Sequence, residues 1–153
     1  MTDTKVILTE QSDDDEEFRK MFLPLIEYLK EVGCEKKKHS KGTRNLLHHL
    51  VSVSAILSER GASDDLCKAG LFHSIYGTSF YKNKTVSLDE RDKIKKLIGE
   101  WAETLVYEFC MLPKDRRSAI MKLENGPLRN DLADLAYANS DEQRLWKEKN
   151  NDN

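Results

Sequence analysis

Residues 44–61, RNLLHHLVSVSAILSERG, carry the clearest helical pattern in the chain. One apolar face repeats at the three- and four-residue spacing of an α-helix, through Leu46, His49, Val53 and Ile56. Gly61 ends the pattern, as glycine commonly does just beyond a helix C-terminus. The stretch therefore predicts a helix with His49 turned inward and His48 on the opposite, solvent-facing side.

The following segment, DDLCKAGLFHSIYG (64–77), predicts a second helix with Ser63 as its N-cap. The same periodicity puts His73 on the inward face, with Leu66, Ala69, Gly70 and Tyr76. Consecutive helices joined by a short loop commonly pack antiparallel, so we expect the two inward histidines to meet. A single inward histidine is more often a hydrogen-bonded core residue than a ligand, but two together favour a site.

The rest of the chain also shows helical signals. Helices are expected at 12–33, with a kink or restart at Pro24, and at 87–99, 99–112 and 127–139, and a last helix is expected from Ser140. We predict an all-α, single-domain bundle of about six to seven helices. It spans residues 13–140, after a flexible arm at 1–12 and before a C-terminal helix and frayed tail at 141–153.

Composition narrows the functional class. The chain has 153 residues, a formal net charge of −2 and three widely spaced cysteines. No apolar run approaches the ~20 residues of a membrane-spanning helix, and the acidic N-terminus does not resemble a signal peptide. We therefore expect a cytoplasmic protein with reduced thiols that binds neither membranes nor nucleic acid.

Three motifs in order support a family resemblance. His49 is followed 24 residues later by His73 in AGLFHSIYGT, then by IGEWAETLV and by DLADLAYAN, which contains Asp134. This order resembles the HD superfamily of all-helical, metal-dependent phosphohydrolases, and within it the ppGpp hydrolases of the bacterial stringent response. The chain also resembles a group of small HD-like proteins that share the pattern AGLFHS-[IV]-YGT.

The resemblance implies a metal site. His49, His73 and Asp134 would hold a single Fe, Mn or Zn ion, and His39 would add a fourth ligand if its connector folds over the site. Ser74 occupies the position of the HD aspartate, and a hydroxyl brings no charge to a metal. In the ppGpp hydrolases the motif is followed by a segment with acidic catalytic residues. In this chain the corresponding segment is shortened to YGT (76–78) and has no acidic residue. The alternative is that the metal was lost with the aspartate and that the histidines remain as buried hydrogen-bonding groups.

Other residues complete the predicted site. Ser74, Tyr76 and Glu103 are the candidate catalytic groups, although a surface charge or a structural ion pair is the favoured interpretation of Glu103. Candidate phosphate-binding residues come from the basic connector and the following loop: Lys38, Lys41, Arg44 and Tyr81. A solvated connector is the alternative interpretation of the basic residues.

Three functions follow from these features. The first is a metal-dependent phosphohydrolase that acts on a small phosphorylated metabolite or nucleotide. The second is a catalytically inactive ligand-binding or regulatory module, which the replacement of the HD aspartate by Ser74 favours. The third is an iron-dependent oxygenase on the same scaffold, although only four histidines are present in the chain. Whether the protein is an enzyme, and its oligomeric state, stay open.

Overall fold

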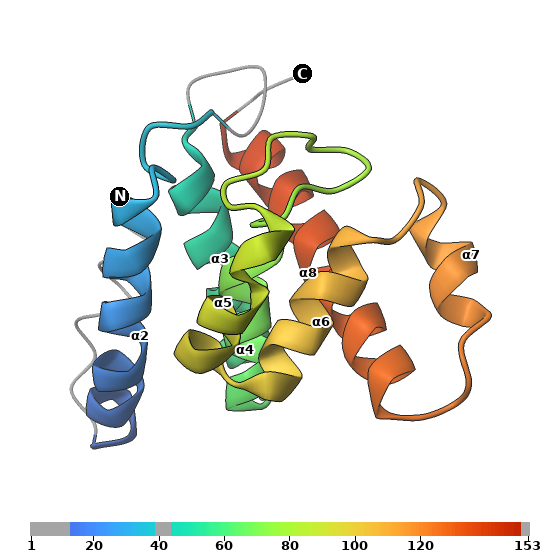
Figure 1. Cartoon of the computed structure of the whole chain (residues 1–153), viewed down its shortest axis with the longest axis horizontal. Helices are drawn as coiled ribbons and strands as arrows, with labels where there is room; N and C mark the ends of the chain where they lie inside the picture. The colour runs from blue at the N-terminus through green and yellow to red at the C-terminus, as the bar shows by residue number, and fades with distance from the viewer. Residues whose placement is uncertain (1–12, 39–43, 151–153) are drawn as a thin grey trace.

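The computed structural model describes residues 13–38 and 44–150, and these residues form an all-α bundle without a β-strand. In chain order the elements are α2 (Asp13–Glu31), α3 (Leu46–Glu59), α4 (Asp64–Phe72), the 3₁₀ turn η1 (Leu88–Glu90), α5 (Arg91–Ile98), α6 (Glu100–Cys110), α7 (Arg116–Met121) and α8 (Pro127–Lys149) (Figure 1). The predicted fold class is confirmed. None of the described helices is long and apolar enough to cross a membrane.

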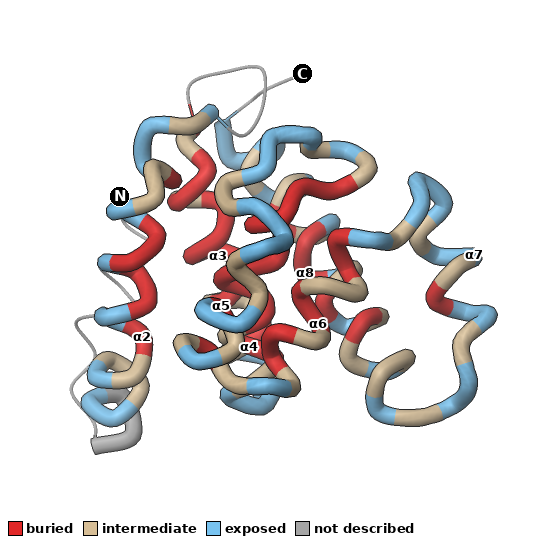
Figure 2. Tube along the Cα trace, viewed as in Figure 1, coloured by how far each residue is buried: buried red, intermediate tan, exposed pale blue. Residues whose placement is uncertain are grey.

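The centre of the bundle is built on α3 and α4. Helix α3 packs against α4 and α8, and α4 also contacts α6 and α8. Helices α2 and α7 lie at opposite ends of the molecule, and burial is concentrated between them (Figures 1 and 2). Because both faces of α3 are covered, more of this helix is buried than an amphipathic pattern predicts, and His48 is half-buried against Trp146.

Gly70 sets the distance between α3 and α4. A Cβ atom at this position would lie 2.6 Å from Leu57 Cδ1 and 3.4 Å from Val53 Cγ1. A larger residue would therefore push the two helices apart. Glycine permits the close approach that brings the inward faces of α3 and α4 into contact.

The ends of α3 and α4 are capped locally. Asn45 is the N-cap of α3, and its side chain accepts a hydrogen bond from the His48 backbone N–H. Ser63 caps α4 as predicted, accepting from the Leu66 N–H. Helix α4 ends at Phe72 and not at Gly77 as predicted, so that His73 is its C-cap, and the chain turns at Gly77, whose φ is +85°.

The C-terminal half departs most from the prediction. Residues 127–149 form one helix instead of two, since its buried line continues past Ser140. The short helix α7 was not predicted. The predicted arm at 1–12 and the last three residues of the tail lie outside the described residues. All three cysteines, Cys34, Cys67 and Cys110, are buried and free.

Candidate functional site

His49 on α3 and His73 at the end of α4 meet in the interior, as their periodicity predicts. Their Nε2 atoms are 3.3 Å apart, and their rings cross at 76° with centroids 5.1 Å apart. His49 is fully buried and His73 is 2% exposed. The two helices thus bring together residues that are 24 positions apart in the chain.

The hydrogen bond made by Nδ1 of each histidine ring fixes the tautomer of that ring. His49 Nδ1 lies 2.6 Å from Glu142 Oε1, and His73 Nδ1 lies 2.8 Å from the Gly70 carbonyl oxygen. Carboxylate and carbonyl oxygens only accept, so each Nδ1 must carry the hydrogen. In the neutral rings both Nε2 atoms therefore present lone pairs.

Burial keeps these rings neutral. It lowers the pKa of His49 to about 3, and the neighbouring Arg44 guanidinium lowers it further. Burial likewise lowers the pKa of His73 to about 3, with a smaller contribution from His49. At neutral pH the 3.3 Å contact therefore joins two lone-pair acceptors rather than a donor and an acceptor.

Asn139 adds a third acceptor. Its Oδ1 lies 2.9 Å from His49 Nε2, and the Gln143 amide donates to the same oxygen at 3.3 Å. Two imidazole nitrogens and one amide oxygen thus converge, an arrangement that a cation between them would stabilise.

The distances suit a metal ion. Two nitrogen ligands that each lie about 2.1 Å from a tetrahedral or octahedral ion are about 3.0–3.4 Å apart, and the histidine nitrogens are 3.3 Å apart. Metal-binding histidines usually donate their other N–H to a carboxylate or carbonyl, as both do here. The two histidine nitrogens therefore have a spacing that would suit a single metal ion, for which Asn139 Oδ1 beside His49 would be the oxygen donor.

A second layer holds Glu142 in place. The Arg44 guanidinium donates to Glu142 Oε2 and lies over the Trp146 ring at 4.5 Å from its centroid. Both Arg44 and Glu142 are 4% exposed. The charge of Glu142 is therefore balanced inside the protein, while its other oxygen orients His49.

The predicted oxygen ligand is placed elsewhere. Asp134 lies on the exposed side of α8. Partial burial of its carboxyl group and the neighbouring Asp131 raise its pKa. It precedes the buried Leu135 by one residue, which turns it about 100° away from the buried line of the helix. The described residues contain no group of three His, Cys, Asp or Glu side chains that could hold a metal. The expected trio with Asp134 is therefore not assembled, and Asn139 takes its place beside His49.

The structure describes three of the four predicted phosphate-binding residues, namely Lys38, Arg44 and Tyr81. The predicted phosphate-binding role of Arg44 is corrected, because its side chain is buried and paired with Glu142 rather than open to a ligand. Lys38 is exposed, and Tyr81 donates to its carbonyl oxygen at 3.3 Å. His39 and Lys41 lie outside the described residues.

Tyr76 and Glu103 form a separate buried cluster with Arg91. The Tyr76 hydroxyl donates to Glu103 Oε2 at 2.8 Å, and Arg91 contacts both carboxylate oxygens, at 2.6 and 2.8 Å. Burial would raise the pKa of Glu103, but the hydrogen bonds from Arg91 and Tyr76 outweigh burial and lower it. Burial raises the pKa of Tyr76. The structural ion pair, one of the two alternatives for Glu103, is what the side chain forms.

Ser74 follows His73 directly and is 4% exposed. Its Oγ has no hydrogen-bond partner among the described residues. A buried hydroxyl left in this state is destabilising unless a ligand or water satisfies it. Ser74 is therefore a buried polar group without a partner in the described part of the chain, next in sequence to a member of the histidine centre (His49, His73, Asn139, Glu142 and Arg44).

The chain belongs to the family described as a domain of unknown function, DUF6817, whose model matches residues 28–114, more than half of the sequence. No curated protein and no solved structure matches the chain. The matched region contains both histidines and Ser74. It ends before α8, which supplies Asn139 and Glu142.

Proposed function

We propose that His49, His73 and Asn139 bind one divalent transition metal ion and that the protein is an HD-like phosphohydrolase of a small phosphorylated metabolite or nucleotide. The observation that carries the proposal is the convergence of three acceptor atoms, His49 Nε2, His73 Nε2 and Asn139 Oδ1, at 2.9 and 3.3 Å. The class of reaction comes from the resemblance of the ordered motifs to the HD superfamily.

Each residue has a defined task in this proposal. Glu142 and the Gly70 carbonyl hold the two rings in the tautomer that presents Nε2. Arg44 contacts Glu142 and holds its carboxylate in place, and Trp146 covers Arg44. Ser74 offers a hydroxyl to a substrate oxygen or to water. A bound metal ion would supply Lewis-acid polarisation of a phosphoryl oxygen or water.

Metal analysis tests the first step. Purified protein is stripped with a chelator, reloaded separately with Mn(II), Fe(II) and Zn(II), and its metal content measured. We expect about one equivalent in the wild type, and a large loss in His73→Gln and Asn139→Ala. The matched control is His48→Gln, which removes a neighbouring histidine that packs on Trp146 and leaves the metal content unchanged. Less than ~0.2 equivalents of every metal in the wild type would contradict the proposal.

A phosphoester panel tests the second step on the same preparations. Hydrolysis that requires the metal and disappears in His73→Gln supports a phosphohydrolase. Oxygen-dependent turnover that needs iron would instead favour the oxygenase.

The non-catalytic binding module is the second candidate. The full burial of His49 and the absence of a carboxylate from the three converging atoms favour it. It predicts metal or ligand binding without turnover on any substrate of the panel. In that case His73→Gln would change thermal stability and binding only.

A further inference from the structure

Arg116, the first residue of α7, carries a guanidinium held between two aromatic rings. Its Cζ lies 4.7 Å from the centroid of Phe80 and 4.5 Å from that of Phe109. Aromatic faces attract a cation without neutralising its charge. The Nε of Arg116 is buried and has no hydrogen-bond partner, and no residue of the described ranges forms an ion pair with this side chain. Its positive charge is therefore not balanced by the described part of the protein.

Five other arginines in the described ranges pair with carboxylates, and Arg117 and Arg129 do not; the pairs are Arg19 with Glu16, Arg44 with Glu142, Arg60 with Asp141, Arg91 with Glu103, and Arg144 with Asp141 and Glu148. The carboxylate next to Arg116 in the sequence, Asp115, is the N-cap of α7 and accepts from the Ser118 N–H. Arg116 thus differs from these arginines in having aromatic neighbours in place of an acid.

The position of Arg116 is fixed on both sides. Phe109 makes an edge-to-face contact with His73, with centroids 5.5 Å apart, so a single ring links Arg116 to the histidine centre. The loop that carries Phe80 is held by Thr78 Oγ1, which accepts from the Phe80 and Tyr81 N–H groups at 3.2 and 2.8 Å. Ser79 also donates to the Leu112 carbonyl, which ties this loop to the segment before α7.

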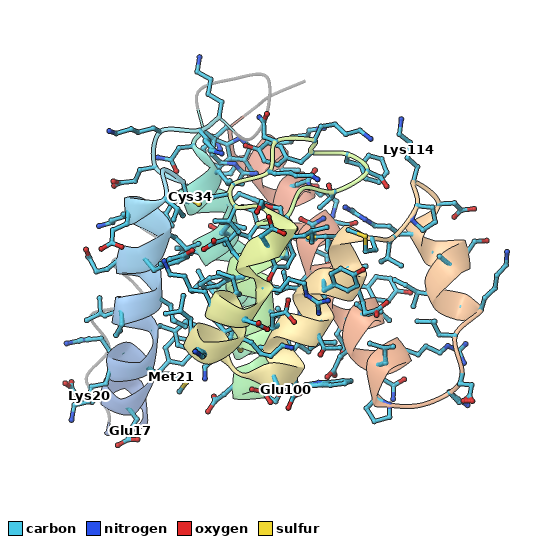
Figure 3. All side chains as sticks on the ribbon, in the orientation of Figure 1. Glu17, Lys20, Met21, Cys34, Glu100 and Lys114 are labelled. Carbon is cyan, nitrogen blue, oxygen red and sulfur yellow. The ribbon has the colours of Figure 1, made fainter. Side chains whose placement is uncertain are left out.

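Lys114, in the segment between α6 and α7, shows the contrasting case. Its side chain extends away from the molecule into solvent (Figure 3). Arg116 is instead half-buried, and the Phe80 ring that it contacts is 61% exposed. The stack of Phe80, Arg116 and Phe109 therefore leads from the surface towards His73.

We propose that Arg116 binds an oxyanion, a phosphate-type group of the ligand, beside the histidine centre, with the exposed Phe80 ring next to it. The planar guanidinium presents its N–H groups in a fork that matches the oxygens of a phosphate. This inference rests on the proposed function in one respect, namely that the oxyanion belongs to the molecule that reaches the histidines. Burial also lowers the pKa of Arg116, and a bound anion would offset that cost of burial.

Calorimetric titration of inorganic phosphate into chelator-treated, metal-free protein tests the proposal. We expect the wild type to bind phosphate and Arg116→Met to bind at least about 10-fold more weakly. Arg116→Lys keeps the charge but loses the planar fork, and should lose less affinity. Arg117→Met is the matched control, because it removes an exposed charge from the adjacent position and should leave the affinity unchanged.

The outcomes separate the two proposals. Equal phosphate affinity of Arg116→Met and the wild type, with or without a lower melting temperature, would show that Arg116 is only a structural clamp. Absence of phosphate binding by the wild type would also overturn the inference. Arg116-dependent phosphate binding by a protein that takes up no metal would support this site and contradict the proposed metal centre. If Arg116→Met does not fold, Arg116→Lys carries the comparison with Arg117→Met.

Discussion

Glu103 and Glu142 are both buried carboxylates that contact an arginine, yet their surroundings differ in one respect. Around Glu103 every donor meets an acceptor, since Arg91 donates to both oxygens and Tyr76 donates to one. Around Glu142 the chain of partners passes through His49 and ends where His49 Nε2, His73 Nε2 and Asn139 Oδ1 meet. All three of these atoms are acceptors.

A buried cluster whose donors and acceptors match is a structural element, because nothing further is needed to satisfy it. A cluster in which acceptors face each other is costly unless a cation enters it. By this criterion the Arg91–Tyr76–Glu103 cluster stabilises the fold, whereas the cluster of His49, His73, Asn139, Glu142 and Arg44, the histidine centre, is where a ligand is expected. Each of the following measurements would sharpen or break this distinction.

The largest expected effect is a loss of stability at mildly acidic pH in the metal-free protein. The folded-state pKa of each histidine is about 3, below the ordinary value of 6.5, so the unfolded chain takes up protons first as the pH falls. The free energy of unfolding is therefore highest above pH 6.5 and falls as the pH is lowered towards 3. The expected loss between pH 7.5 and pH 5 is about 2 kcal/mol for each histidine.

Urea unfolding at several pH values measures this effect. His73→Gln should flatten the dependence, because one of the two titrating groups is gone. Tyr76→Phe, in the matched cluster, should keep the slope of the wild type. Equal slopes for His73→Gln and the wild type would mean that the histidines are not the groups that titrate.

The second-largest effect is expected on the free energy of unfolding when the Arg91–Tyr76–Glu103 cluster is disrupted. Glu103→Ala leaves the Tyr76 hydroxyl buried without its acceptor and removes the partner of Arg91, so we expect a loss of about 3 kcal/mol in unfolding free energy. Metal content should not change, because Glu103 contacts neither histidine in the structure. Glu100→Ala, on the same helix but exposed, is the control and should cost under about 0.5 kcal/mol. Loss of bound metal from folded Glu103→Ala protein would break the division between the two clusters.

Much of the fold and half of the histidine centre could be predicted from sequence. The periodicity around His49 and His73 is strong because α3 and α4 each have a continuous apolar face, which on α4 extends to its C-cap, His73. Ser63 likewise predicts the start of α4, because its side chain is a favoured N-cap. These signals are local, and the structure confirms them.

The other half depends on α8, where local signals mislead. Ser140-Asp-Glu-Gln143 looks like a new helix start, but it lies inside one helix whose buried line includes Leu132, Leu135, Asn139 and Glu142. A single helix through 127–149 would have placed Asn139 and Glu142 on the inward face. The partner of Arg44 could not be found in this way, because it lies 98 positions away in the chain.

A smaller effect is expected at Glu142. Glu142→Gln keeps the shape of the side chain but weakens the acceptor that holds His49 Nδ1–H, so Nε2 is presented less firmly. We expect about a 10-fold loss of affinity for the reloaded metal, measured by competition with a chelating dye. The control is Glu148→Gln on the exposed part of α8. Equal metal affinity of Glu142→Gln and Glu148→Gln would show that Glu142 does not orient a ligand.

The smallest effect is expected at Tyr76. In Tyr76→Phe both oxygens of Glu103 still contact Arg91, so only one hydrogen bond is lost and no buried acceptor is left without a donor. We expect a loss of about 1 kcal/mol in unfolding free energy, against no measurable loss for Tyr137→Phe, whose ring is exposed. Metal content and hydrolysis should match the wild type. Loss of hydrolysis in a folded Tyr76→Phe protein would instead make Tyr76 a catalytic group, and the matched cluster would then belong to the active site.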